Sequence, residues 1–539
     1  MTKSFTLSAL AIALSTAATG LAAQAINENQ MSDPRVRQAI AYAIDMDTIA
    51  ETLFEGAAIP AAGILPNPAF KPDDLNPYAY DPDRARALLA EAGWDANREL
   101  QIVYYYGDQT TADFMAAVQA YLADVGIQSS YRLIEGDVGS QINTLPADPV
   151  AGPSSLDWDI LYGARAALAL QEYFNRYAPG LSPTVPNVPE LNTLVAQINS
   201  TTDPALQRDG YMQLERIFND QVYMLPLYYQ QIYIVESDRV NRNGGAYGNE
   251  QYNYDWGITG WTVEPNADGV AEMYTNNGPQ QFFEVPWQNL GIWTHNKFAF
   301  DTILAADSNL VPASGELAET YSISDDGLTF TMTLRDGLTW HDGSPITGED
   351  VAWSIQTAAM FPITHPVLTS TFNRIEGAAA FKAGEADSMS GIAVDGNTVT
   401  VTFAEIDPNV LLTFSQFAPL PSALLAGTDP VELQQNEFWQ MPVGSGPFQI
   451  SEVHMNDFVV LTPFENYWGG VPQIERIVAL PSFDGDPNLL VNAAAGRVDY
   501  AYTKNTTDVP QLEAMGNMRV TPASVNYTRL FWFNQFPRE

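Results

Sequence analysis

The first half of the chain alternates between segments with the hydrophobic spacing of helices and segments with that of strands. Apolar residues recur at helical spacing over 34–54, where an Asp-Pro pair provides an N-cap and a proline in the first turn. A second Asp-Pro pair opens a helix over 81–94, which ends at a glycine. Residues 100–106 then predict a strand, 112–125 a helix and 128–133 a strand. This order favours an α/β unit with a parallel sheet.

The second half of the chain shows strand-like alternation bounded by turns. Residues 330–334 and 399–403 alternate between apolar and polar side chains, and each run follows a turn that contains Asp-Gly. The capping sequence Thr-Gly-Glu-Asp over 347–350 predicts the start of a helix. Residues 529–533 predict one more strand just before the C-terminus. We therefore expect an α/β fold throughout.

Length and charge limit the possible architecture and partners. At 539 residues the chain is too long for one hydrophobic core, so two or three domains are expected. Its 64 acidic residues outnumber 24 Lys and Arg, and the net charge of -40 repels nucleic acid and anionic lipids. This charge is typical of an acidic, solubilising surface, and it would also attract a cationic ligand. Charge alone does not separate these two explanations.

The first 25 residues have the pattern of a secretory signal. Lys3 supplies a positive start, residues 5–21 form an apolar stretch, and Ala-Gln-Ala at 23–25 is a small-x-small cleavage site. The apolar stretch is short for a membrane span. The chain contains no cysteine, so a lipid cannot be attached through a thiol. We expect a mature chain from Ile26 that is freely soluble in the periplasm.

The sequence lacks the usual patterns of catalytic and metal sites. Its four histidines are not spaced as a metal pair, and there is no cysteine nucleophile. Neither a Walker loop nor a G-x-S-x-G elbow occurs. We therefore expect no enzymatic activity, no metal and no cofactor.

Two segments carry a family resemblance. Residues 32–45, Ser-Asp-Pro-Arg-Val-Arg-Gln-Ala-Ile-Ala-Tyr-Ala-Ile-Asp, and residues 325–343, which end in Leu-Thr-Trp-His-Asp-Gly, resemble the peptide/nickel class (family 5) of extracellular solute-binding proteins of ABC importers. Gly-Ser-Gly at 444–446, Asn-Tyr-Trp-Gly-Gly at 466–470 and the segment 495–501 resemble further parts of this family. In the family, the segment that resembles 325–343 comes early and the one that resembles 32–45 comes late. The chain therefore resembles a circularly permuted member.

The resemblance implies a type II periplasmic-binding-protein-like fold, in which two lobes, one with an additional domain, close on a ligand. It also makes the turn around His341 structural. The implied division is a signal peptide over 1–25, the second lobe over 26–235, the end of the first lobe and a linker over 236–269, and the first lobe over 270–539, with the additional domain at about 310–425. Relatives cross between lobes twice. In the permuted order only the crossing near 233–238 is expected to stay covalent, which would loosen the hinge.

One stretch indicates where a ligand would bind. Peptide-binding relatives carry an aspartate that holds the amino group of the peptide, in a stretch that residues 159–168 resemble. Ala167 stands where this aspartate is expected. Arg165 can instead face the cleft and bind a carboxylate or hydroxyl groups through its fork of donors. The alternative is a surface ion pair between Arg165 and Glu172.

Amides and aromatic rings complete the candidate site. Asn276, Asn277 and Gln281 follow the first strand of the first lobe, a place that often lines the cleft in relatives, and amides suit hydroxyl-rich or amide-bearing ligands. Aromatic rings can provide stacking platforms, although an isolated tryptophan is more often a core or rim residue. The aromatic candidates are Tyr162, Trp287, Trp293 and Trp532.

The function that the resemblance implies is that of a periplasmic substrate-binding protein. Such a protein takes a peptide or a related small organic solute between its lobes and delivers it to an ABC permease in the inner membrane. An oligosaccharide is the alternative ligand, because the expected aspartate is missing and amides and aromatic rings are available. A ligand-presenting chemosensory protein is an alternative of another class. We expect a monomer without a nucleic-acid partner.

Overall fold

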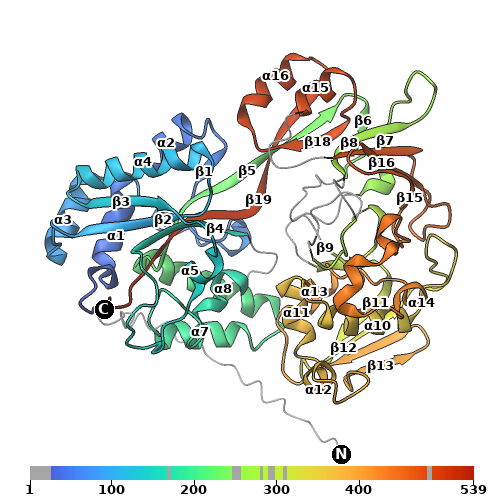
Figure 1. Cartoon of the computed structure of the whole chain (residues 1–539), viewed down its shortest axis with the longest axis horizontal. Helices are drawn as coiled ribbons and strands as arrows, with labels where there is room; N and C mark the ends of the chain where they lie inside the picture. Colours follow the sequence, from blue (N-terminus) through green and yellow to red (C-terminus); the bar gives the residue numbers. More distant parts are fainter. Residues whose placement is uncertain are drawn as a thin grey trace, which may run out of the picture.

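One mixed β-sheet extends from one half of the molecule into the other (Figure 1). The computed structural model describes residues 26–166, 171–245, 257–278, 283–288, 290, 298–306, 312–481 and 488–538. Within these ranges the sheet has eleven strands in the order β15-β16-β17-β8-β18-β5-β19-β4-β2-β3, with β1 added to β5. The buried side chains fall into two halves. We call them the amino lobe, built around residues 31–228 and 530–533, and the carboxyl lobe, built around residues 232–525.

The amino lobe is an α/β unit whose central strands are parallel, as the sequence predicts. Strand β2 pairs in parallel with β3 on one edge and with β4 on the other. The elements of this lobe are α1 (Pro34–Ala43), α2 (Met46–Thr52), β1 (Ala58–Pro60), α3 (Pro82–Ala92), β2 (Glu99–Tyr104), α4 (Gln109–Asp124), β3 (Gln128–Leu133), α5 (Val138–Asn143), β4 (Ile160–Ala166), α6 (Gln171–Phe174), a 3-10 turn (Asn175–Tyr177), α7 (Pro189–Ile198) and α8 (Pro204–Gln221).

The helix predicted over 34–54 is two helices in the structure. Ile44 has an extended backbone that ends α1, and the Asp45 carboxylate accepts a hydrogen bond from the backbone N–H of Thr48 at 3.0 Å to cap α2. Aspartate at this position favours a new helix start because it satisfies an N–H that has no partner within the helix. Ile40, Ile44 and Ile49 still join one core, so the hydrophobic spacing does not reveal the break.

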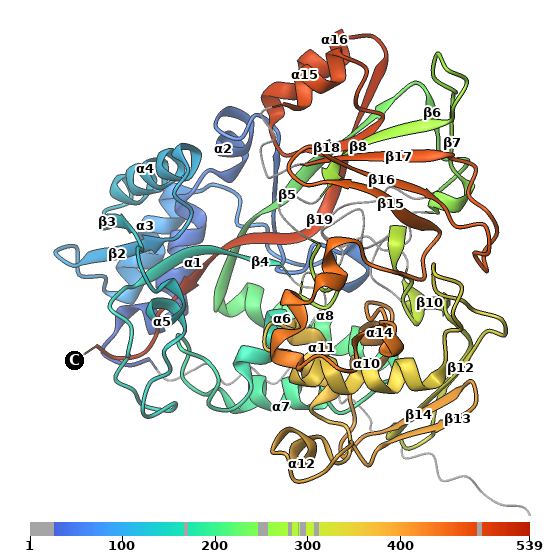
Figure 2. The ribbon, with the colours of Figure 1, turned by 45° about the vertical axis from the view of Figure 1, so that its right-hand side comes forward.

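The carboxyl lobe combines its part of the large sheet with a smaller layered unit. This unit is a four-stranded antiparallel sheet, β11-β12-β14-β13, which lies beside α10, α11 and α12 (Figures 1 and 2). The elements are β6 (Val240–Asn241), β7 (Thr262–Val263), β8 (Glu272–Gly278), β9 (Leu304–Ala306), β10 (Pro312–Gly315), β11 (Ala318–Ile323), β12 (Thr329–Leu334), α10 (Gly348–Met360), α11 (Pro366–Phe372), α12 (Ala378–Lys382), β13 (Ile392–Asp395), β14 (Thr398–Thr402), α13 (Val410–Phe414), α14 (Ser422–Leu425), β15 (Phe448–His454), β16 (Phe458–Pro463), β17 (Arg476–Pro481), α15 (Leu489–Ala494), β18 (Tyr500–Thr503) and α16 (Val509–Ala514).

Two long antiparallel strands cross from one lobe to the other. They are β5 (Met224–Ser237), with 14 residues, and β19 (Met518–Phe533), with 16. The sequence interpretation left only the crossing near 233–238 covalent and placed all of 270–539 in the first lobe. The structure differs, because the end of β19 pairs with β4 from Tyr527 to Phe533. Phe531 enters one core of the amino lobe and Trp532 enters the other, so this strand is a central part of that lobe.

The turn around His341 is structural, as the resemblance implied. The backbone N–H of Gly444 donates to Nδ1 of His341 at 3.1 Å, and Nε2 lies 2.9 Å from the carbonyl oxygen of Gly446. Burial lowers the pKa of His341 to about 4, so the ring is neutral and its Nε2–H donates to Gly446. The histidine thereby joins two segments that the sequence analysis singled out.

The two ends of the described chain meet in the amino lobe. The side-chain amide of Asn29 donates to the backbone oxygens of Asn534 at 2.9 Å and Phe536 at 2.7 Å. The Asn27 amide donates to Gln535 O at 3.0 Å. Asn29 and Asn534 are 505 positions apart in sequence. Residues at the two ends are therefore neighbours in the fold, held by backbone carbonyls.

Candidate functional site

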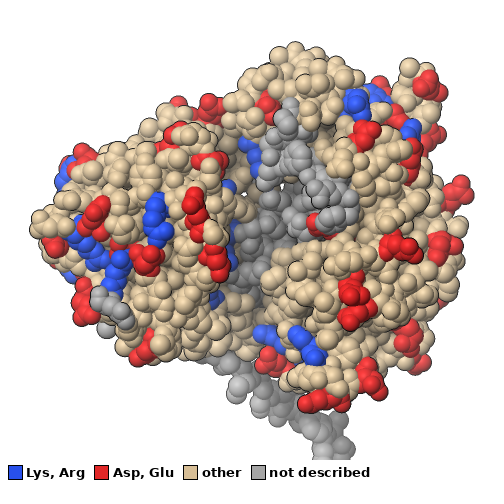
Figure 3. Space-filling model, in the orientation of Figure 1, with Lys and Arg blue, Asp and Glu red and all other residues tan. Residues whose placement is uncertain are grey.

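The space-filling view has a hollow between the two lobes, and Lys and Arg side chains are visible on its amino-lobe side (Figure 3). Strands β2 and β4 are parallel and end at Tyr104 and Ala166. In α/β sheets, ligands bind beyond the carboxyl ends of such strands. The candidate site therefore lies where these two strands end and β19 passes beside them.

Direct contacts join the lobes at two separate places. The hydroxyl of Thr506, which follows β18, donates to the Glu55 carboxylate of the amino lobe at 3.2 Å. The side-chain amide of Gln207 on α8 donates to the carbonyl oxygen of Pro408 in the carboxyl lobe at 3.0 Å. Both are hydrogen bonds between polar groups that water can also satisfy, so opening the lobes costs little at these points.

Two arginines converge on Trp532 at the end of β4. The guanidinium carbons of Arg165 and Arg176 lie 5.8 and 5.6 Å from the centre of the indole ring. Trp532 is 3% exposed, and its Nε1 has no hydrogen-bond partner within the described residues. Burial, together with the nearby charge of Arg165, lowers the pKa of Arg176 to about 10. A guanidinium with this pKa is still charged at neutral pH, so two like charges sit together.

Gly163 makes this arrangement possible. A Cβ atom at this position would lie 2.7 Å from the Tyr105 hydroxyl and 2.7 Å from the indole of Trp532. The Tyr105 hydroxyl also accepts a hydrogen bond from the backbone N–H of Ala164 at 3.1 Å. Only glycine lets the tyrosine and the tryptophan approach the strand this closely.

Arg529 lies on the opposite face of the same ladder. Arg165 pairs with Thr528 and Ala164 with Arg529, so the two arginine side chains point to opposite sides of the sheet. The guanidinium carbon of Arg529 is 3.9 Å from the ring centre of Tyr106 and 5.1 Å from that of Tyr527. Its Nη2 donates a hydrogen bond to Oε1 of Gln230 at 3.3 Å. The electron-rich faces of these two rings attract the guanidinium and hold it in place.

The structure places some of the predicted site residues at the end of β4 and others in the hydrophobic core. Arg165 and Trp532 come together at the end of β4, as described above. Tyr162 instead lies in the core, 1% exposed, with its hydroxyl 2.8 Å from that of Tyr228. Trp287 is also a core residue, because it is fully buried and its Nε1 donates to Ala418 O at 2.8 Å. Both predictions of a stacking platform therefore differ from the structure.

Asn276 is buried on β8, 1% exposed, and its amide donates to Tyr502 O at 3.3 Å. Its Oδ1 has no partner within the described part of the chain. The backbone of Asn277 belongs to β8, while its side chain lies outside what the structure describes. Gln281, Trp293 and Ala167 also fall outside the described residues, as does the side chain of Glu172. Their predicted roles stay predictions.

Sequence reasoning missed Arg176, Arg529 and the tyrosines around them. A weak signal existed, because residues 104–106 are three consecutive tyrosines directly after a strand. Arg529 was also a charged residue at the start of an otherwise apolar strand. Arg176 had no such signal, since the short helix that carries it reaches Trp532 only through the tertiary fold.

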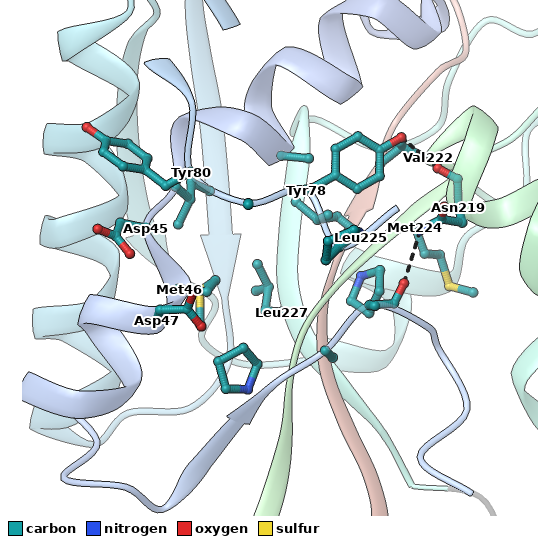
Figure 4. A pocket seen from close by; sticks show the side chains of 18 of the residues that line it. Asp45, Met46, Asp47, Tyr78, Tyr80, Asn219, Val222, Met224, Leu225 and Leu227 are labelled. Carbon is teal, nitrogen blue, oxygen red and sulfur yellow. Dashed lines mark hydrogen bonds between the residues drawn. The ribbon is translucent and has the colours of Figure 1, made fainter. Parts of the chain in front are cut away.

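A second pocket lies within the amino lobe, between β5 and the loop that carries Tyr78 and Tyr80 (Figure 4). Two of the polar groups labelled there have partners inside the protein. The Tyr78 hydroxyl donates to Asn219 O at 2.7 Å, and the Asn219 amide donates to Ala62 O at 3.1 Å. The end of β4 is the stronger candidate site, because it combines two guanidinium groups with an aromatic ring next to the ends of two parallel strands.

A family model for bacterial extracellular solute-binding proteins, family 5, matches residues 7–157 and 313–536. The chain belongs to this family. The family assignment made from the sequence is thereby confirmed, and the exchanged order of its two halves stays a prediction. Within the described residues, no helix is both long enough and apolar enough to span a bilayer.

Individual relatives of this family 5 protein match over part of their length. A Brucella ovis protein named as an ABC transporter peptide-binding protein is 28% identical over 238 residues, 44% of this chain and 42% of that one. The glutathione-binding protein of Escherichia coli K12 is 28% identical over 174 residues, 32% and 30% of the two chains. Among solved structures, the oligopeptide-binding protein AppA from Bacillus subtilis is 19% identical with a TM-score of 0.38, over 45% of each chain. The chain thus spans less than half the length of the curated relatives it matches.

Proposed function

We propose that this family 5 protein is the substrate-binding component of an ABC importer and that it binds a peptide or a related small solute between its lobes. The observation that carries the proposal is the two-lobed sheet. Two long strands, β5 and β19, join the lobes, and a hollow lies between the lobes (Figure 3). A protein that binds a ligand in one arrangement of its lobes better than in another shifts toward that arrangement without chemical change.

The crossing strands have a feature suited to such movement. The pairing of β19 with β5 is interrupted between Ser524 and Thr528, where the register shifts. A β-bulge leaves residues outside the ladder and bends the strand, so it concentrates backbone adjustment at one place. The bulge lies where β19 leaves the carboxyl lobe, because Val525 packs in that lobe and Tyr527 already pairs with Ala166.

Peptides are the favoured ligand class because proteins named as peptide-binding and glutathione-binding are among its relatives. An oligosaccharide is the alternative within the same function. A receptor that presents its ligand to a chemosensory partner would bind in the same way and differ only in the partner. Identifying the partner protein therefore tests delivery to a permease, and a ligand screen tests binding.

The first experiment is a thermal-unfolding screen with di-, tri- and pentapeptide pools, oligosaccharides and metal chelates, followed by small-angle scattering with each hit. A ligand at 100 times its Kd stabilises the native state by about 2.7 kcal/mol, which gives a clear rise in Tm. We expect a rise with peptides and a smaller radius of gyration in the complex. A rise in Tm with oligosaccharides alone would show that oligosaccharides, and not peptides, are the ligand class. No rise with any pool would refute the binding function.

We also propose that the two halves of the family fold occur here in exchanged order. The neighbouring positions of Asn29 and residues 534–536 support this, since they place the end of the last strand beside the start of the first helix. A chain rebuilt with residues 270–538 before residues 26–261 is the test. It should fold with nearly the same Tm and circular dichroism as the present order. An aggregated or unfolded product would count against the exchange.

A further inference from the structure

The space around Trp532 in the amino lobe has an excess of hydrogen-bond donors. Nε of Arg165, Nε of Arg176 and Nε1 of Trp532 are all buried atoms without a hydrogen-bond partner among the described residues. The hydroxyl of Tyr177, in the same 3-10 turn as Arg176, is buried and has no partner there either. A buried donor without a partner destabilises the fold, and the more so when it is charged. Such a set of groups is stabilised by an acceptor that carries negative charge.

No carboxylate of the described chain supplies this charge. The described residues contain no ion pair for Arg165 or Arg176, although most other arginines of the amino lobe lie within 4 Å of an aspartate. The groups that act on the pKa of Arg176 are Arg165, Tyr177 and Tyr105, and none of them is acidic. The nearest polar partner is Asn143, whose Oδ1 accepts a hydrogen bond from Nη2 of Arg176 at 3.0 Å. In a protein with a net charge of -40, two adjacent arginines without an acid are a local exception.

We propose that Arg165, Arg176 and the indole N–H of Trp532 form a carboxylate subsite, which selects peptides with a free terminal or side-chain carboxylate. This deepens the proposed function, on which the peptide part of the inference rests. Guanidinium groups match the planar geometry of a carboxylate and bind it with two parallel hydrogen bonds. Two positive charges favour a ligand end with two carboxylates, such as a C-terminal glutamate. Trp532 adds a fixed donor and a flat wall.

The subsite explains the close packing at Gly163. Tyr105 and Trp532 press against this glycine, so the indole is fixed between the strand and the two guanidinium groups. A site whose donors are held before the ligand arrives loses little entropy on binding. The same geometry rejects a lysine or an amidated end, because either would leave the buried donors unpaired or add a third positive charge.

The test compares three tripeptides by calorimetry: Ala-Ala-Glu, Ala-Ala-Lys and the C-terminal amide of Ala-Ala-Gln. We expect wild type to bind Ala-Ala-Glu at least 10-fold more tightly than the amide, as expected for charge-assisted hydrogen bonds. In Arg165→Gln and Arg176→Gln this preference should vanish. Arg165→Lys should keep part of this preference, because lysine retains the positive charge but lacks the forked pair of guanidinium donors. Arg132→Gln, which removes a surface arginine of the same lobe, is the matched control.

A separate measurement keeps this inference distinct from the peptide-binding function. Glutarate at 20 mM, against sodium chloride of equal ionic strength, should raise the Tm of wild type and Arg132→Gln but not of the two subsite variants. That result supports the subsite even if no peptide binds. Equal shifts in all four proteins would overturn it. An acid preference that appears only in Glu172→Gln would also overturn it, because Glu172 would then occupy the site in the wild type.

Discussion

Two adjacent arginines of the amino lobe differ from two buried arginine pairs of the carboxyl lobe. In the carboxyl lobe, Arg239 lies 3.0 Å from the Asp499 carboxylate, and Arg242 lies 2.7 Å from that of Glu236. Both acids are 2% exposed, so each buried negative charge is matched by the chain itself. In the amino lobe, Arg165 and Arg176 sit together without an acid among the described residues. The difference indicates that the first pairs stabilise the fold and that the second pair is kept for a ligand.

The largest expected effect comes from breaking a pair in the carboxyl lobe. Asp499 accepts hydrogen bonds from Arg239, from the Ser237 hydroxyl at 2.7 Å and from the Tyr274 backbone N–H at 2.9 Å. Asp499→Ala should lower the free energy of unfolding by about 3–5 kcal/mol, because it leaves Arg239 unpaired in a largely buried site. Urea unfolding measures this. Asp157→Ala, at an exposed pair, should change little, and a similar loss in both variants would contradict the comparison.

The second test concerns a buried acid of the amino lobe that no arginine neutralises. Glu215 accepts backbone hydrogen bonds from Ile64 at 2.9 Å and Leu65 at 2.5 Å. Burial raises its pKa from 4.5 to about 7, against the opposing effects of these two N–H groups and of Lys71. Protonation therefore stabilises the folded chain. This contribution is fully present below about pH 4.5 and is lost as the pH rises through 7.

Glu215→Gln removes this titration. Between pH 4.5 and 8 the wild type should lose roughly 3 kcal/mol of unfolding free energy relative to the variant. Urea titrations at five pH values measure the difference, with Glu99→Gln on the surface as the control. Parallel curves for wild type and Glu215→Gln would show that Glu215 does not titrate in this range.

A smaller effect is expected at the meeting point of the chain ends. Asn29→Ala removes the two hydrogen bonds to the backbone of residues 534 and 536, and also those that Asn29 Oδ1 accepts from the Met31 N–H and from Arg98; together this should cost about 1–2 kcal/mol. Amide hydrogen exchange should also become faster at the end of β19. Asn97→Ala, at an exposed asparagine, is the control. Unchanged exchange at residues 530–533 would show that the contact does not hold the strand.

The smallest effect is expected for Arg165→Gln. Because Arg165 has no acidic partner in the described structure and lies near the like charge of Arg176, its removal should not lower the free energy of unfolding. Arg239→Gln, at a paired arginine, should lower it. Equal losses in the two variants would mean that Arg165 is also a structural residue.

The sequence predicted those parts of the fold that depend on local patterns. The strands and helix over 100–133 appear as β2, α4 and β3 because their spacing and caps are local properties. The destination of β19 was not predictable in this way, since it depends on pairing with β4, far away in the chain. Tyr162 was misplaced because helices cover both faces of this sheet, so alternation along β4 does not separate core from cleft.

The site was predictable only in part for the same reason. Arg165 was found through its place after a predicted strand and next to a missing aspartate. Trp532 was found as an aromatic ring in the last strand. Arg176 reaches them from a different segment, and its position relative to Trp532 follows from how the helices pack on the sheet. Such convergence of distant segments leaves no spacing in the sequence.

The position of β19 has a consequence for how the protein is made. The amino lobe consists mostly of residues before β5, yet its strand between β4 and β5 is produced only after residues 238–517. Until that strand emerges, Phe531 and Trp532 are missing from two cores, and the edges of β4 and β5 are bare. The lobe that is translated earlier therefore cannot complete its native structure until the whole of the intervening segment has been made.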